Sequence, residues 1–328
     1  MKKILSLVMA VLLVCGICLS FTSCGDTADF TVGVAQLAPH VALDAASQGF
    51  MDALEAELAK EGKTVKFVEQ NAGGEISACP SIIGSFVAND YDLILANATP
   101  VLQAAKSATS TIPILGTSVT EYGVALGIEN FSGTVGTNVS GTSDLAPLTE
   151  QAQMMIDTLS LDGSDKVGLL YCSSEDNSTY QVAVVKKYLT DNNIPCKEFS
   201  FADSNDLTAV VTNAASECTA IYVPTDNTVA DNTGIIKNAC MAKKVPVFAG
   251  EEGICSGCGY ATLSIDYYNL GKKTGEMAAE ILLNKKHVED MPIAYDANPT
   301  KKYNKEICDA LNIDTAALEA AGYVAISK

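Results

Sequence analysis

Short apolar runs alternate with amphipathic segments along most of the chain. A run such as 220–223, which contains isoleucine and valine, is typical of a strand buried in a parallel sheet. Apolar residues three and four positions apart, as in 41–58, predict helices instead. Strands are expected at 30–37, 64–68, 93–96, 112–116, 134–142, 166–171, 196–201, 220–223, 245–248, 260–265 and 323–326, and helices at 41–58, 82–87, 101–108, 150–159, 180–189, 206–216 and 270–283.

The alternation of strands and helices starts again near residue 165. The segment 166–171 (KVGLLY) repeats the pattern of 31–35 (TVGVA), with a glycine at the same place in each predicted strand. Strands that alternate with helices form open parallel sheets covered by helices on both faces. We therefore expect an α/β protein with two doubly wound parallel-sheet lobes joined by a hinge. Residues 30–142 are expected to form the N-terminal lobe and residues 143–254 the C-terminal lobe, with residues 255–328 divided between them.

The start of the chain has the pattern of an export signal. Lys2 and Lys3 precede the apolar run 4–21, and small residues precede Cys24. This predicts a signal peptide at 1–23, a lipid attached to Cys24 and a polar tether at 24–29. A retained membrane-spanning helix is the alternative, since the apolar run is long enough to cross a bilayer. In either case the folded part is expected outside the cell.

Polar residues follow the predicted strands of both halves. Pro224 ends the strand 220–223, and the segment 225–228 (TDNT) offers side chains that cap helices; the segment 97–100 (NATP) follows strand 93–96 in the same way. The carboxyl ends of parallel strands are where open α/β sheets place ligands. The candidate ligand-binding residues are Gln36, Leu37, His40, Leu43, Asp44, Thr99, Pro100, Ser118, Val119, Thr120, Asp144, Ser173, Ser174, Glu175, Asn177, Ser178, Asp226, Asn227, Gly250 and Glu251.

The charge of the chain limits the kinds of ligand that these candidate residues could bind. The formal net charge is −18, and all 21 basic residues are lysine. So acidic a protein repels nucleic acid and anionic lipid. A ligand carboxylate would have to bind backbone N–H groups and hydroxyls, since no predicted strand end carries a lysine, and Asp226 or Glu251 would meet a ligand ammonium. The pattern favours a small zwitterion, although both acids are also suited to capping their own helices.

No catalytic or cofactor motif accompanies the candidate residues. The chain has no G-x-S-x-G, H-E-x-x-H or phosphate-binding glycine loop, so no enzyme activity and no cofactor or metal is expected. Cys255 and Cys258 are the one local cysteine pair. They are compatible with a disulfide, with metal or redox chemistry, or with unpaired core thiols. His40 is compatible with a ligand contact or with a surface position near a helix cap.

Seven segments, taken in order, resemble one bacterial family. They are VGVAQLAPHVALDAASQGF, NATPVLQAAKSAT, GTSDLAP, LYCSSEDNS, IYVPTDNTV, VFAGEEG and IDYYNLG, between residues 31 and 313. They look like the ABC-transporter substrate-binding lipoproteins of the tryptophan- and tyrosine-binding type. The resemblance implies a type I periplasmic-binding fold with three hinge crossovers, which we place near 140–145, 249–254 and 297–303.

The resemblance also implies a function. The expected role is to capture a small molecule, here an amino acid of the aromatic type, and to deliver it to an ABC permease. The family's ligand contacts would fall on Gln36 to Asp44, Thr99, Ser118 to Thr120, Ser174 to Ser178, and Asp226 with Asn227. An extracytoplasmic sensor of the same fold is the first alternative, and an exported redox enzyme that uses Cys255 and Cys258 is the second.

Overall fold

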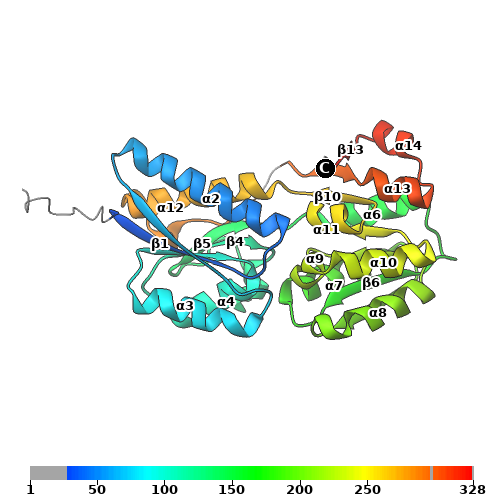
Figure 1. Ribbon diagram of the computed structural model, residues 1–328, viewed down its shortest axis with the longest axis horizontal. Helices are drawn as coiled ribbons and strands as arrows, with labels where there is room; N and C mark the ends of the chain where they lie inside the picture. Colours follow the sequence, from blue (N-terminus) through cyan, green and yellow to red (C-terminus); the bar gives the residue numbers. More distant parts are fainter. Residues whose placement is uncertain (1–27, 296–297, 327–328) are drawn as a thin grey trace, which may run out of the picture.

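The computed structural model describes residues 28–295 and 298–326. The predicted signal peptide, Cys24 and most of the predicted tether lie outside the described residues. Figure 1 shows two lobes side by side, each with a central sheet between layers of helices. Within the described part of the chain, no helix combines the length and the apolar character needed to cross a membrane.

The first lobe has a six-stranded sheet in the order β11-β5-β4-β3-β1-β2, and all its strand pairs are parallel. Apolar clusters fill both faces of this sheet, one under α2 and α12 and the other under α3, α4 and α5. The elements are β1 (Phe30–Gln36), α2 (Val41–Lys60), β2 (Val65–Asn71), η1 (Ile76–Ala78), α3 (Cys79–Ala88), β3 (Leu93–Asn97), α4 (Thr99–Ala108), β4 (Ile114–Val119), α5 (Tyr122–Leu126), β5 (Val139–Ser143), α12 (Tyr267–Leu282), η2 (Val288–Asp290) and β11 (Ala294–Tyr295).

The second lobe has a seven-stranded sheet in the order β13-β12-β10-β9-β8-β6-β7, in which only the pair of β10 and β12 is antiparallel. Helices α6, α7, α13 and α14 cover one apolar face, and α8, α10 and α11 the other. The predicted fold class is confirmed. The elements are α6 (Leu148–Leu159), β6 (Val167–Cys172), α7 (Asp176–Asp191), β7 (Cys196–Phe201), α8 (Ser204–Glu217), β8 (Ala220–Val223), α9 (Asn227–Asp231), α10 (Thr233–Lys243), β9 (Val247–Ala249), α11 (Glu252–Gly257), β10 (Ala261–Ser264), β12 (Thr300–Tyr303), α13 (Lys305–Leu311), α14 (Thr315–Ala320) and β13 (Val324–Ala325).

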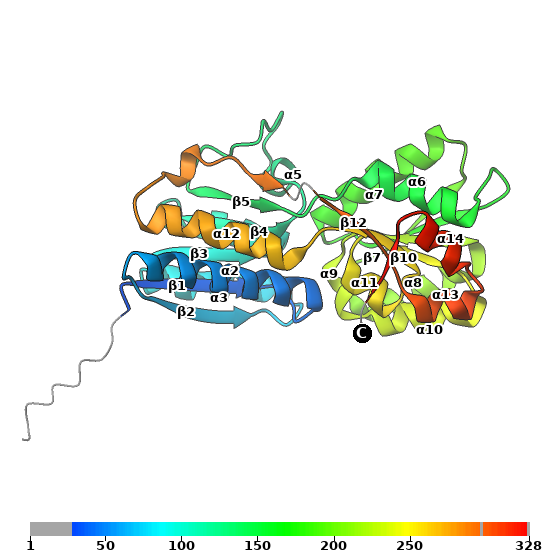
Figure 2. The same cartoon turned by 90° about the horizontal axis from the view of Figure 1, so that it is seen from above.

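Helices α2 and α12 pack side by side at very close range (Figure 2). Glycines make this approach possible: a Cβ atom on Gly271 would overlap the backbone oxygen of Ala46, and one on Gly275 the backbone oxygen of Phe50. Gly49 of α2 meets the backbone of Tyr268 in the same way. The helix that enters the first lobe from the hinge is therefore held backbone to backbone against the helix that follows β1.

The chain passes between the lobes at three places. The first crossover follows β5, near the predicted 140–145. The third lies between β11 and β12, near the predicted 297–303. The second prediction, 249–254, is wrong, because β9 is followed by α11 and β10 within the second lobe. The second crossover instead lies between Ser264, at the end of β10, and Tyr267, at the start of α12.

The predicted strand 134–142 is shorter in the structure and begins at Val139. Gly133 and Gly136 have φ angles of 97° and 71°, a left-handed backbone that cannot continue a strand. The β-branched residues between these glycines therefore belong to an irregular loop that precedes β5.

Candidate functional site

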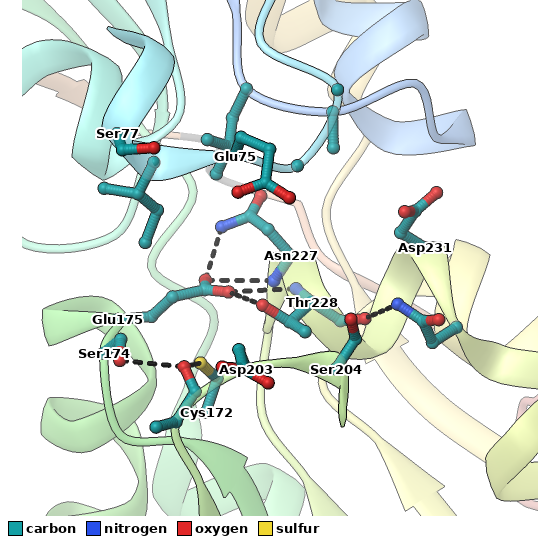
Figure 3. A pocket seen from close by; sticks show the side chains of 17 residues that line it. Glu75, Ser77, Cys172, Ser174, Glu175, Asp203, Ser204, Asn227, Thr228 and Asp231 are labelled. Carbon is teal, nitrogen blue, oxygen red and sulfur yellow. Dashed lines mark hydrogen bonds between the residues drawn. The ribbon is translucent and has the colours of Figure 1, made fainter. Parts of the chain in front are cut away.

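A cavity of about 500 Å³ lies between the lobes, at the carboxyl ends of strands from both sheets (Figure 3). Its wall includes Leu37 after β1, Gly73 after β2, Ser174 after β6, Ala202 after β7 and Asn227 after β8. Both lobes therefore contribute to it, as expected for a ligand site of doubly wound sheets.

Four of the predicted ligand-binding residues line this cavity: Leu37, Ser174, Glu175 and Asn227. The lining also includes Glu75, Asp203 and Asp231, which the sequence analysis did not select. None of the described residues that line the cavity is a lysine. An anionic ligand group would therefore find no cationic side chain in this wall.

Glu175 joins two elements of the second lobe at the cavity wall. Its carboxylate accepts hydrogen bonds from the backbone N–H groups of Asn227 (3.0 Å) and Thr228 (2.9 Å) and from the Asn227 side-chain amide (2.6 Å). The negative charge thus lies at the start of α9, where free N–H groups stabilise it. These bonds fix the orientation of the Asn227 amide, with its nitrogen toward Glu175 and its oxygen free to accept (Figure 3).

A second group of polar atoms, buried and without partners, lies near the strand ends but outside the lining of the 500 Å³ cavity. Among the described residues, seven buried side-chain N or O atoms have no hydrogen-bond partner. Asn97 and Ser118 lie at the carboxyl ends of their strands, and Asp144, Thr99, His40 and Asn177 follow a strand by one to five residues, whereas Thr262 lies within β10. An unpaired buried polar group costs roughly 1–3 kcal/mol, so six at one end of the sheets indicate a binding surface. These six are His40 Nδ1, Asn97 Oδ1, Thr99 Oγ1, Ser118 Oγ, Asp144 Oδ1 and Asn177 Oδ1.

The backbone is strained at two of these strand ends. Ala98, between β3 and α4, has φ 97° and ψ 153°, and Ser118 near the end of β4 has φ 52°. Neither residue is a glycine, so each conformation costs roughly 1–3 kcal/mol. Strain of this kind persists where surrounding structure enforces it, most often at binding sites. Here it orients the start of α4 and the Ser118 hydroxyl.

Asp144 is a buried carboxylate at the first crossover. One oxygen accepts a hydrogen bond from the hydroxyl of Tyr267 (2.9 Å), the first residue of α12, and the other has no partner among the described residues. Burial raises the pKa of this carboxyl, and the nearby Thr120 side chain and the hydrogen bond from Tyr267 act in the opposite direction. A cation that reached the free oxygen would stabilise the ionised form.

Asp226 and Glu251, the predicted partners of a ligand ammonium, act as helix caps in the structure. Asp226 accepts from the backbone N–H groups of Val229 (2.9 Å) and Cys172 (2.7 Å), so both of its oxygens are occupied. Glu251 accepts from Gly253 and Ile254 at the start of α11. The free carboxylate oxygen belongs instead to Asp144, which the sequence analysis selected without assigning it this role.

The buried acids predict that stability falls as pH rises. Burial raises the pKa of Glu251 to about 7, and burial together with the charge of Glu175 raises that of Asp226. The folded state therefore binds more protons than the unfolded state between about pH 4.5 and 7, and the stability contributed by protonated Glu251 is lost across that window. We expect urea denaturation to show a free energy of unfolding about 1–3 kcal/mol lower at pH 8 than at pH 5. Glu251→Gln should flatten the slope, and an unchanged slope would contradict this assignment.

The remaining predicted residues support the site or the core. Gln36 donates to Asp44 (2.7 Å), and both line a smaller recess of about 210 Å³ beside β1 and β2. Ser173 and Thr120 make backbone or hydroxyl contacts within their own lobes. Gly250 packs against the backbone of Pro224, where a Cβ atom would clash. Leu43, Pro100, Val119 and Ser178 are buried side chains.

Hydrogen bonds between described side chains join one lobe directly to the other. His40 Nε2 lies 3.4 Å from Asn227 Oδ1, and the Gln103 side-chain amide donates to Asp176 (2.8 Å). Gln103 lies one turn after Thr99, and Asp176 adjoins Asn177, so the second bond brings the starts of α4 and α7 together. Sequence reasoning missed Asn97, Gln103 and Asp176, because nothing in their local pattern separates them from ordinary surface or cap residues.

All eight cysteines of the described chain are free, so this structure does not contain the Cys255–Cys258 disulfide that was one of the alternatives left open by the sequence. Both residues are fully buried around α11, and burial raises the pKa of each thiol well above its ordinary value. Reactive thiols are exposed and have lowered pKa values. Cys255 and Cys258 therefore have the character of core residues, the third of the alternatives that the sequence left open.

Comparison with known proteins decides the family. The family model described as ABC transporter substrate binding protein matches residues 31–320. The chain belongs to this family. It is 34% identical to the tyrosine-binding protein of Clostridioides difficile (strain R20291) over 296 residues. The matched region covers 89% of this chain and 84% of that protein.

Two solved structures of related binding proteins bear on the arrangement of the lobes. An ABC domain from Streptococcus pneumonia in complex with L-Trp is 30% identical and superposes with a TM-score of 0.82 over 90% of this chain and 99% of that chain. The ligand-free, open structure of a substrate binding protein with adhesive properties from Clostridium difficile is 35% identical but has a TM-score of 0.67, over 91% and 100%. The whole chain thus superposes more closely on the L-Trp complex than on the ligand-free, open structure.

Proposed function

We propose that this protein is the extracytoplasmic solute-binding component of an ABC importer and that it captures an aromatic amino acid between its lobes. In this proposal a lipid on Cys24 anchors it to the outer face of the bacterial cytoplasmic membrane. The family supports the role of binding protein. The tyrosine-binding relative and the L-Trp complex support the ligand class. The observation that carries the proposal is the set of unpartnered polar atoms at the strand ends.

The chemistry of these atoms suits the two charges of an amino acid. The free oxygen of Asp144 is the one unpaired carboxylate oxygen among them, so it would accept the ligand ammonium. Thr99 is the first residue of α4, and Ser118 follows Thr117, which pairs with Asn97 at the end of β3. Their free hydroxyls and the first backbone N–H of α4 would bind the ligand carboxylate without a lysine. The free Oδ1 of Asn177, in the second lobe, can only accept, so it would receive a hydrogen bond from the ligand ammonium.

Closure of the lobes is the mechanism that follows. Contacts to both lobes exist only in the closed form, so a ligand that makes them shifts the equilibrium toward closure by its differential affinity. The protein's own cross-lobe bonds, His40 to Asn227 and Gln103 to Asp176, favour the same form. A permease that recognises the closed arrangement would then respond to occupancy.

A thermal-shift screen of the mature protein tests the proposal. The panel contains the common amino acids, nucleosides and sugars. We expect tyrosine or tryptophan to raise Tm, with stabilisation of roughly 2.7 kcal/mol at a hundredfold excess over Kd. Nucleosides and sugars should leave Tm unchanged. A panel in which no amino acid raises Tm would remove the proposed ligand class.

A further inference from the structure

His40 reaches across the gap between the lobes instead of serving its own helix. It occupies the residue before α2, yet its side chain makes no capping hydrogen bond to that helix. Its Nε2 lies 3.4 Å from the side-chain oxygen of Asn227 in the second lobe. Asn227 lines the 500 Å³ cavity, and so do Leu37 and Ala38, which precede His40 in the chain. The imidazole therefore lies at the edge of this cavity, although His40 is not itself a lining residue, and the side chain of a ligand would extend into the cavity.

The hydrogen bonds around Asn227 determine which nitrogen of His40 carries the proton. The Asn227 amide nitrogen donates to Glu175 at 2.6 Å, so the amide oxygen is the group that faces His40. An amide oxygen can only accept, and therefore His40 Nε2 must donate. Burial lowers the pKa of His40, which favours the neutral ring. In that tautomer Nδ1 carries a lone pair and can only accept.

His40 Nδ1 is buried and has no partner among the described residues. The charged groups that face the ring are the carboxylates of Glu175 on the turn before α7, Asp44 on α2 and Asp231 on α9. Ionised carboxylates only accept hydrogen bonds, so none of them can donate one to His40 Nδ1. A hydrogen-bond donor must therefore come from outside this set of side chains.

We propose that His40 Nδ1 accepts a hydrogen bond from the side chain of the bound amino acid, and that His40 thereby selects rings that carry a donor. This inference rests on the proposed function and narrows its ligand class. The phenol O–H of tyrosine and the indole N–H of tryptophan are such donors. Phenylalanine has none and would leave the buried acceptor unpaired. A site built around a hydrogen bond discriminates strongly against analogues that lack it.

Isothermal titration of the mature protein with matched ligands tests the inference. L-Tyrosine and 4-fluoro-L-phenylalanine have nearly the same size, but only the first carries a donor on the ring. We expect tyrosine, or tryptophan if that is the preferred ligand, to bind at least about tenfold more tightly than 4-fluoro-L-phenylalanine and L-phenylalanine. Equal affinities would overturn the inference and leave the proposed function standing. The absence of binding by every amino acid would defeat the proposed function itself.

A substitution of His40 tests the residue directly. His40→Phe keeps a planar ring and removes the acceptor, so the preference for tyrosine over 4-fluoro-L-phenylalanine should fall to within about threefold. His287→Phe is the matched control, because His287 is the other histidine of the chain and is exposed on the far side of the first lobe. It should keep the wild-type preference. An unchanged preference in His40→Phe would contradict the role of His40. If His40→Phe does not fold, the ligand comparison in the wild-type protein still decides.

Discussion

Gly271→Ala is expected to destabilise the protein by about 3 kcal/mol or more, a large effect for one methyl group. The added Cβ atom would overlap the backbone oxygen of Ala46 in α2. Backbone atoms cannot move aside as a flexible side chain can, so α2 and α12 would have to separate along their contact. The clusters of apolar residues beneath both helices would loosen with them. Urea denaturation at constant pH measures the loss.

Gly84→Ala is the matched control for this change. Gly84 lies inside α3, and a Cβ atom there would meet nothing within 4 Å. Alanine is the better helix former by about 0.5–1 kcal/mol, so this variant should be slightly more stable than the wild type. Equal stability of Gly271→Ala and the wild type would show that the two helices are not in backbone contact.

Asp144→Asn is expected to weaken amino-acid binding about 100-fold, because it removes the charge that pairs with the ligand ammonium in a buried site. The amide can still accept from Tyr267, so the contact between the first crossover and α12 is preserved. It also removes a buried ionisable group, and the variant should therefore fold at least as well as the wild type. The loss of affinity is measured by isothermal titration, with the amino acid that gives the largest increase in Tm as the ligand.

Asp90→Asn controls for the loss of one negative charge. Asp90 is exposed beyond α3 and has φ 49°, a conformation that asparagine tolerates well. This variant should bind with wild-type affinity. If Asp144→Asn binds as tightly as Asp90→Asn, the ammonium lies elsewhere and the assignment of charges in the site is wrong.

The fold could be predicted from the sequence to a large extent. Buried parallel strands such as β3 and β8 are continuous apolar runs, and the polar residues that follow them are helix starts, so both signals are local. The second crossover could not be predicted in this way. The segment after β9 is as polar as a hinge, but its Glu251 caps α11 inside the second lobe. Which lobe a strand joins depends on sheet pairing between distant residues.

The position of the candidate site could be predicted from the sequence, but the roles of its residues could not. Five of the six unpartnered atoms at the strand ends belong to residues that the pattern selected, namely His40, Thr99, Ser118, Asp144 and Asn177. The pattern could not tell Asp144 from Asp226, since both are acids directly after or near a strand end. Their difference arises in three dimensions: Asp226 has two backbone N–H partners, whereas Asp144 keeps a free oxygen.

A crystal structure of the mature protein with the amino acid that it binds most tightly tests the central claim most directly. The account predicts a ligand enclosed by both lobes, with its ammonium within hydrogen-bond distance of Asp144 and its carboxylate beside Thr99 and Ser118. A ligand held by one lobe alone, or one that leaves the free oxygen of Asp144 unpaired, would contradict it.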